Sequence, residues 1–220
     1  FSRLPLGGVS WLTVKFLELA SKNPRLRRYV LVLEDIADAR PPSQVEGGSL
    51  DDALISLETL AKFHAHHWMN EESIAVSDRI WALNRLPKVS QASYARNREE
   101  FIGRFGELVG DEKMRVIDDT QDRLEDLLEP LAQDPWTLLH GDYRLDNIMF
   151  RPNGEIVVID YQLLSKGRPG WDVAYFITTA LSADYKSEEE TMLKHYHETL
   201  LRAGITNYSF EELVDDVELT

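Results

Sequence analysis

The feature that most constrains the fold is a polar loop followed by two short apolar segments between residues 140 and 160. The loop, residues 140–147, has the sequence His-Gly-Asp-Tyr-Arg-Leu-Asp-Asn. Residues 147–150 and 155–159 are mainly apolar, and the Arg-Pro-Asn-Gly sequence between them is typical of a tight turn. We therefore expect a β-hairpin whose second strand ends at Asp160, beside the polar loop.

Three side chains of this unit have the chemistry that phosphoryl transfer from ATP requires. That reaction needs a carboxylate to orient the attacking hydroxyl and accept its proton, and oxygen ligands to hold magnesium on the phosphates. In kinase catalytic loops four residues separate the base Asp from a metal-binding Asn, and Asp142 and Asn147 have this spacing. The sequence thus predicts Asp142 as the catalytic base, with Asn147 and Asp160 as Mg²⁺ ligands.

Two departures separate this chain from protein kinases. Gly141 stands where protein kinases have Arg, and Tyr161-Gln162 follows Asp160 in place of Phe-Gly. These differences favour a small molecule over a protein as the phosphate acceptor.

The motifs resemble those of the phosphotransferase enzyme family, which includes aminoglycoside phosphotransferases, choline kinases and ecdysteroid-kinase-like proteins. Besides the polar loop and residues 159–162, the matching segments are residues 31–36, 60–65 and 171–175. The resemblance implies an α+β, bilobal protein-kinase-like fold with a small mixed N-terminal lobe, here apparently incomplete, and a larger, mainly helical C-terminal lobe. It also implies ATP and Mg²⁺ as cofactors and a small hydroxyl-bearing molecule as substrate. The motifs are closer to the ecdysteroid-kinase-like or acyl-CoA-dehydrogenase-associated branch than to the resistance enzymes.

The resemblance also implies a division into residues 1–34, a partial nucleotide-binding lobe, and residues 35–220, the catalytic and substrate-binding lobe. Lys15 would reach the α and β phosphates, and the backbone at Glu34 and Ile36 would contact adenine. A surface position for Lys15 is an equally good interpretation. Only about 33 residues precede Glu34, where the resemblance puts the connection between the lobes, whereas such an N-terminal lobe usually has ~80 or more. Either pieces of the lobe are absent from the sequence or the chain is truncated.

Two further candidates near the N-terminus are weaker. Glu18 would be the ion-pair partner of Lys15, and Gly7 and Gly8 would be remnants of a glycine-containing nucleotide loop. Adjacent glycines by themselves indicate only a turn.

The rest of the sequence predicts helices. Apolar periodicity and capping residues predict helices over residues 49–68, 89–108 and 111–131, one opening near Trp171, and two starting at capping boxes, Ser187 with Glu190 and Ser209 with Glu212. Asp172 is placed to cap its helix. By resemblance it also hydrogen-bonds the backbone of the polar loop, in which His140 would have a positioning role.

The sequence allows two interpretations of the role of several polar residues. Arg144 could stabilise the transferring phosphate or pair with Asp146. The histidines at 64, 66 and 67 lack the carboxylate of a recognised zinc motif. We expect His64 in the core and His66 and His67 partly exposed.

The composition indicates which partners the protein can bind and where in the cell it is expected. With 38 acidic and 24 basic residues the net charge is -14, which argues against nucleic-acid binding. The absence of cysteine excludes disulfides and favours a cytoplasmic location. The apolar stretches are too short to span a bilayer. The sequence does not set the oligomeric state.

Two alternative functions belong to other classes. One is a catalytically inactive, kinase-like nucleotide-binding protein that regulates a partner, against which the intact Asp142, Asn147 and Asp160 speak. The other is a metal-dependent hydrolase built on His140, Asp142 and the helical histidines.

Overall fold

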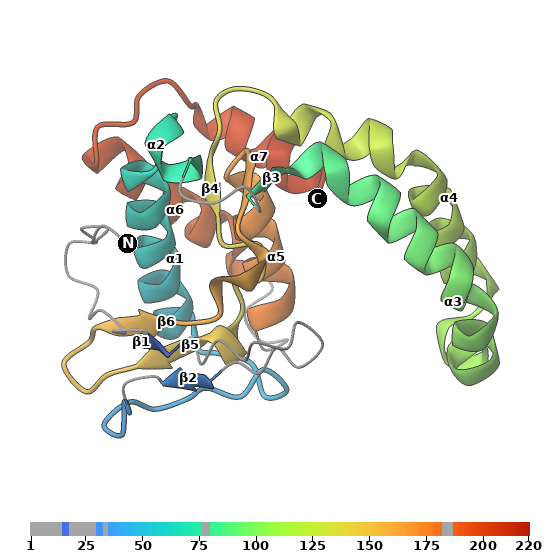
Figure 1. Cartoon of the computed structure of the whole chain (residues 1–220), viewed down its shortest axis with the longest axis horizontal. Helices are drawn as coiled ribbons and strands as arrows, with labels where there is room; N and C mark the ends of the chain where they lie inside the picture. The colour runs from blue at the N-terminus through green and yellow to red at the C-terminus, as the bar shows by residue number, and fades with distance from the viewer. Residues whose placement is uncertain (1–14, 18–29, 33–34, 76–79, 182–186) are drawn as a thin grey trace.

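Helices make up most of the described part of the computed structural model, and the strands described there form three small sheets (Figure 1). The structure describes residues 15–17, 30–32, 35–75, 80–181 and 187–220. The helices are α1 (Leu50–His66), α2 (Glu71–Ile74), α3 (Leu86–Val109), α4 (Asp111–Leu128), α5 (Gly170–Ala180), α6 (Glu189–Arg202) and α7 (Phe210–Glu218). The strands are β1 (Lys15–Leu17), β2 (Val30–Val32), β3 (Trp81–Ala82), β4 (Thr137–Leu139), β5 (Ile148–Phe150), β6 (Ile156–Val158) and β7 (Ser165–Gly167). None of the described helices has both the length and the apolar character needed to cross a bilayer.

The predicted hairpin is confirmed. Strands β5 and β6 pair antiparallel, with Ile148 opposite Val158, and the Arg151 N–H donates to the Glu155 carbonyl at 2.8 Å to close the turn. In a second sheet β7 lies between β3, to which it is parallel, and β4, to which it is antiparallel. The third sheet pairs β1 with β2. The polar loop runs from β4 into β5, so two sheets fix its ends.

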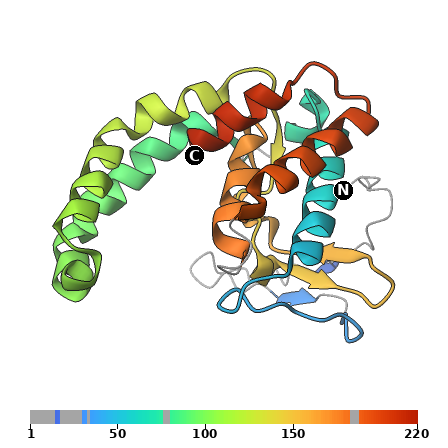
Figure 2. The ribbon, with the colours of Figure 1, turned by 180° about the vertical axis from the view of Figure 1, so that it is seen from behind.

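Helix α1 lies in the centre of the core. Its apolar residues recur at helical spacing, which buries one face from Ala53 to His64 against α6, α5 and the hairpin. The helix starts as predicted, because the Ser49 side chain accepts a hydrogen bond from the Asp52 N–H at 3.1 Å. Figure 2 shows α6 and α7 covering the opposite side of the body from the view of Figure 1.

Three of the predicted helix boundaries need correction. Helix α3 begins at Leu86, three residues before its predicted start, because Pro87 is tolerated in the first turn of a helix. Helix α4 ends at Leu128, because Pro130 lacks the N–H that would continue it and begins a short 3₁₀ turn instead. Ser187 caps no helix, because Ser187 and Glu188 form a 3₁₀ turn and α6 begins at Glu189. The capping box of Ser209 with Glu212 is confirmed at the start of α7.

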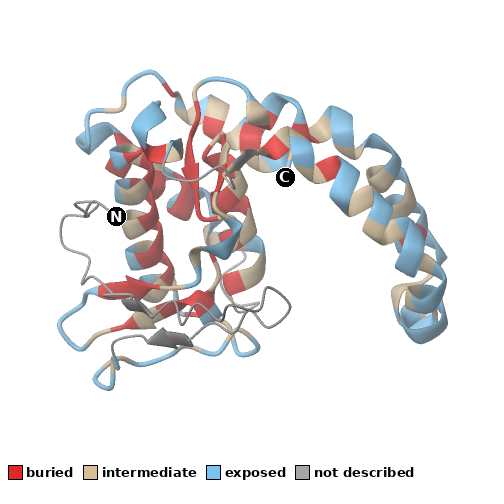
Figure 3. Cartoon of the chain, in the orientation of Figure 1, coloured by how far each residue is buried: buried red, intermediate tan, exposed pale blue. Residues whose placement is uncertain are grey.

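Helices α3 and α4 form a hairpin that projects from the body (Figure 1). Most of its surface is exposed (Figure 3), and its only buried residues are Pro87, Met114 and Leu128. A bidentate ion pair between Arg98 and Asp118 joins the two helices, and the Tyr94 hydroxyl donates to the same carboxylate at 2.6 Å.

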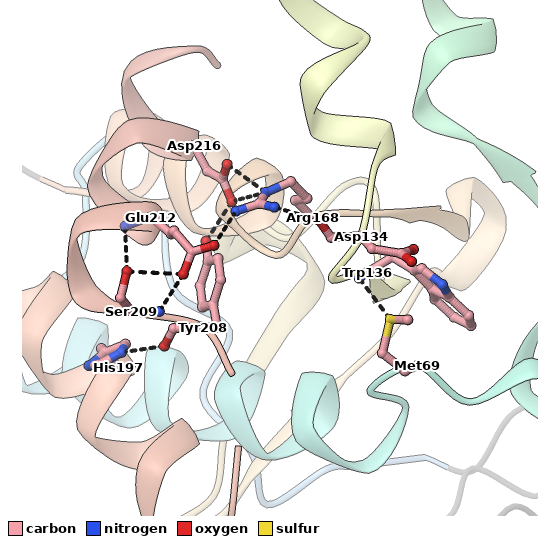
Figure 4. A network of polar contacts seen from close by, with 9 residues as sticks. All are labelled: Met69, Asp134, Trp136, Arg168, His197, Tyr208, Ser209, Glu212 and Asp216. Atoms are coloured by element: carbon pink, nitrogen blue, oxygen red, sulfur yellow. Dashed lines mark hydrogen bonds and ion pairs between the residues drawn. The ribbon is translucent and has the colours of Figure 1, made fainter. Parts of the chain in front are cut away.

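A polar network attaches α7 to the segment that leads into α5 (Figure 4). The Arg168 Nε atom lies 2.8 Å from both carboxylate oxygens of Asp216, and the Tyr208 hydroxyl donates to Asp216 Oδ2 at 2.6 Å. At Gly170 the backbone approaches Asp216 so closely that a Cβ atom would collide with the Asp216 side chain. These contacts fix the first turn of α5.

Candidate active site

The start of the polar loop is held by a buried carboxylate from α5. Asp172 accepts hydrogen bonds from the N–H groups of His140, at 2.7 Å, and Gly141, at 2.9 Å. The predicted contact between Asp172 and the loop backbone is therefore confirmed. The predicted capping role is wrong, because α5 begins at Gly170 after Pro169 and its first turn has no side-chain cap.

His140 links the loop to the end of β6. The Asp142 N–H donates to Nδ1 of His140 at 3.2 Å, so the proton lies on Nε2, which donates to the Ile159 carbonyl at 3.0 Å. Burial lowers the pKa of His140, which favours this neutral form. The geometry confirms His140 as a positioning group.

The helical histidines have structural contacts. His64 is buried, with Nδ1 2.7 Å from the Tyr196 hydroxyl and Nε2 3.2 Å from Asp172 Oδ2, as expected of a core residue. The prediction that His67 is partly exposed is wrong. The side chain is buried, and its Nδ1 atom lies 2.8 Å from Ser73 Oγ on α2. Burial lowers the pKa of His67 to about 4. Among the described residues no three His, Asp or Glu side chains gather to hold a metal, so the hydrolase hypothesis lacks its ligand set.

The Asp142 carboxylate has a donor on each oxygen. Asn147 Nδ2 donates to Asp142 Oδ2 at 3.0 Å and to the Asp142 carbonyl at 2.8 Å, so the loop brings these two predicted site residues together. The Tyr175 hydroxyl donates to Oδ1 at 3.1 Å. The Asp142 side chain is 15% exposed, which leaves part of it open to a reactant.

Asp160 follows β6 in a left-handed conformation with φ 64°. Its side chain is exposed, and Gln162 Nε2 donates to Oδ2 at 3.2 Å. The Ile159 N–H donates to the Asn147 carbonyl at 2.9 Å. The residue before Asp160 is thus bonded to Asn147, as the hairpin prediction required.

The structure shows the pairing of Arg144 with Asp146, whereas its role in stabilising the transferring phosphate stays a prediction. The Arg144 Nε atom lies 3.4 Å from Asp142 Oδ1, and Nη1 lies 3.8 Å from Asp146 Oδ2. The side chain is 39% exposed, so the guanidinium can still meet an anion at the loop.

The N-terminal candidates are only partly described. Lys15 lies in β1 opposite Val32, but its side chain is outside the described part of the chain, as are Glu18 and Glu34. Ile36 precedes a turn in which its carbonyl accepts from the Ala39 N–H at 3.0 Å. Gly7 and Gly8 also lie outside the described residues.

A cavity of about 370 Å³ lies between α1 and the β5–β6 hairpin. His140, Tyr143 and Tyr161 form its wall beside the loop, and Phe63 is part of its α1 wall. Burial raises the pKa of Tyr161 to about 12, so its phenol stays protonated at neutral pH. Asp142 and Asn147 do not line this cavity, so it is separate from the carboxylate of the candidate site.

Tyr175 is the residue at this site to which sequence reasoning gave no role. The available signal was its spacing of three residues from Asp172 in a predicted helix, which places both side chains on one face. That signal indicates a shared face but not the loop that the face meets.

The backbone conformation at position 141 explains why this loop has Gly where protein kinases have Arg. The φ of Gly141 is +82°, and a Cβ atom there would collide with the Leu163 carbonyl oxygen. We expect Gly141→Ala to lower the free energy of unfolding by more than about 3 kcal/mol, since the clash adds to the cost of positive φ. Urea unfolding measures the difference.

Gly154→Ala is the matched control for Gly141→Ala. Gly154 has φ +83°, but nothing lies within 4 Å of its added Cβ atom. This variant should lose only about 1 kcal/mol from backbone strain. Equal losses in the two variants would contradict the close contact with Leu163.

Comparison with known proteins gives a match to a family model and to a curated protein. The sequence model of the ecdysteroid kinase-like family matches residues 12–205. Acyl-CoA dehydrogenase family member 11 of Gallus gallus is 33% identical over 87 residues, which are 39% of this chain and 11% of that protein.

Two of the matching solved structures show the shared fold. One is a Ralstonia eutropha JMP134 protein with the provisional description aminoglycoside phosphotransferase, with a TM-score of 0.58 and 20% identity over 89% of this chain. The other is an aminoglycoside phosphotransferase from Alicyclobacillus acidocaldarius, with a TM-score of 0.52 and 18% identity over 94% of this chain. The chain spans 62% of each of these structures. At this identity the likeness establishes the fold alone.

Proposed function

Because the chain belongs to the ecdysteroid kinase-like family, we propose that it is an ATP-dependent kinase that transfers the γ-phosphate to a hydroxyl group of a small molecule. The observation that carries this proposal is the Asp142 carboxylate, held by Asn147 in a loop with kinase spacing and partly open to solvent. A carboxylate in this arrangement can orient a hydroxyl and accept its proton.

The residues of the site suit magnesium bound to ATP. The two side-chain hydrogen bonds of Asn147 both use Nδ2, so its Oδ1 atom is available to a cation. Asp160 offers an exposed carboxylate. Mg²⁺ prefers oxygen ligands and is commonly held by one or two carboxylates together with substrate phosphates, whose charge it neutralises. Asn147 and Asp160 are therefore the proposed metal ligands.

The proposed reaction balances at Asp142. The acceptor hydroxyl gives its proton to the Asp142 carboxylate while its oxygen forms a bond to the γ-phosphorus. The bond between that phosphorus and the β,γ-bridging oxygen breaks, and ADP leaves with the bond's electron pair. Arg144, 3.4 Å from Asp142, supplies a positive charge close to the transferring group.

The nucleotide side of the proposal rests on the family resemblance. Residues 1–34 form the partial nucleotide-binding lobe and residues 35–220 the catalytic lobe of a bilobal kinase-like fold. Lys15 binds the α and β phosphates, and the backbone at Glu34 and Ile36 binds adenine. A cytoplasmic location belongs to the same proposal. The inactive alternative is less well supported, because Asp142 and Asn147 are present and already bonded to each other.

A thermal shift experiment tests the nucleotide site first. We expect ATP with Mg²⁺ to raise the melting temperature of the protein, since a ligand that binds only the folded state stabilises it. ATP in the presence of EDTA should give a much smaller shift. Equal shifts with and without Mg²⁺ would contradict a metal-dependent nucleotide site, and no shift with either would contradict nucleotide binding.

A further inference from the structure

We propose that Tyr175 is a positioning residue for phosphoryl transfer, which holds the Asp142 carboxylate in one orientation. This inference rests on the proposed function, because it assigns a role toward the same carboxylate. The hydroxyl of Tyr175 lies 3.1 Å from Asp142 Oδ1.

Helix α5 contacts the catalytic loop through two residues three positions apart. Asp172 binds the loop backbone at His140 and Gly141, and Tyr175 binds the side chain of Asp142. Residues at this spacing lie on the same face of a helix. One rigid element thus sets both the path of the loop and the direction of its carboxylate.

Two donors together prevent rotation of the carboxylate. Asn147 occupies one lone pair of Oδ2, and Tyr175 occupies one lone pair of Oδ1. Rotation of the carboxylate about its Cβ–Cγ bond would break both hydrogen bonds. Each carboxylate oxygen can accept two hydrogen bonds, so an acceptor hydroxyl can still bind the second lone pair of Oδ2. Without Tyr175, Oδ1 would keep only its 3.4 Å ion-pair contact with Arg144 Nε, which is not a hydrogen bond, and Asn147 would be the one hydrogen-bond donor to the carboxylate.

The phenol is suited to act as a donor. Burial, followed by the hydrogen bond with Asp142, raises the pKa of Tyr175, so the hydroxyl keeps its proton. The adjacent residue, Phe176, is fully buried, and its ring centroid lies 5.5 Å from that of Tyr143 in the catalytic loop. Tyr175 therefore lies on a helix that packs against the catalytic loop. A side chain on a rigid, packed helix is positioned more precisely than one on a loop.

Tyr175→Phe tests this role, because it removes the hydroxyl and keeps the ring. The probe is the slow hydrolysis of MgATP, in which water replaces the acceptor hydroxyl. We expect kcat to fall about 10-fold to 100-fold, with the KM for MgATP and the MgATP-induced thermal shift unchanged. A merely structural role would instead lower nucleotide binding or the melting temperature of the free protein.

Tyr94→Phe is the matched control. Tyr94 also donates its hydroxyl to an aspartate, Asp118, but on the α3–α4 hairpin. The kcat of the Tyr94→Phe variant should equal that of the wild type. If Tyr175→Phe also keeps the wild-type kcat, or loses MgATP binding, the positioning role is overturned while the kinase assignment stands. If the wild-type protein neither binds nor hydrolyses MgATP, the proposed function fails, and the role of Tyr175 fails with it.

Discussion

Replacement of Asp142 by Asn is expected to lower turnover by about 10³-fold, the usual scale for loss of a general base, while MgATP binding is retained. Asparagine has nearly the same shape, and its carbonyl oxygen can still accept a hydrogen bond from Asn147 or Tyr175. The loop should therefore keep its conformation, and the loss of turnover should come from lost proton acceptance together with one of the two hydrogen bonds that the carboxylate accepts. Steady-state hydrolysis of MgATP, measured beside a thermal shift with MgATP, separates the two properties.

Asp146→Asn is the matched control for Asp142→Asn. It makes the same chemical change in the same loop, at a carboxylate that is about half exposed. The Asp146 Oδ2 atom lies 3.8 Å from Arg144 Nη1. Turnover should be close to that of the wild type. Undiminished turnover in Asp142→Asn would remove the catalytic-base assignment. Loss of turnover in both variants would show that the effect comes from the charge of the loop and not from Asp142 in particular.

Asp160→Asn is expected to weaken Mg²⁺-dependent binding of ATP by about 10-fold to 100-fold, since it removes the charge of a proposed metal ligand. Asp160 has φ 64°, and Asn tolerates this left-handed conformation as well as Asp does. Backbone strain should therefore not change. Titration of ATP at fixed Mg²⁺ measures the affinity, and titration of Mg²⁺ at fixed ATP identifies the metal as the cause.

The control for Asp160→Asn is Glu155→Gln, which neutralises an exposed carboxylate on the same hairpin. It should leave both titrations unchanged. An Asp160→Asn variant with wild-type affinity for MgATP would exclude Asp160 as a ligand. A variant that binds ATP less well even in EDTA would assign Asp160 to the nucleotide site without a metal role.

Local patterns in the sequence predicted the elements that carry the site. The hairpin of β5 and β6 follows from two mainly apolar segments around Pro-Asn-Gly, and α1 from its cap at Ser49 and its apolar period. The spacing of Asp142 and Asn147 was informative because both lie in one short loop, whose geometry depends on few residues. Their hydrogen bonds are accordingly those of neighbours in the chain.

Contacts between distant segments could not be predicted in the same way. His67 is buried because α2 brings Ser73 against it, although its position near the end of the predicted helix 49–68 suggested partial exposure. Helix periodicity identifies a face, but not the neighbour that covers it. The boundary at Ser187 was also missed, because a capping-box pattern cannot show that the chain first makes a 3₁₀ turn.

The sequence by itself determined the family, the position of the candidate loop and the identity of its carboxylates, because these depend on residue types at short, fixed spacings. Only the tertiary structure decided what holds the loop. Asp172 and Tyr175 are 31 and 33 residues from their partners Gly141 and Asp142, and they meet them because α5 packs against the loop. Such contacts depend on the packing of whole helices and sheets, which no local pattern in the chain specifies.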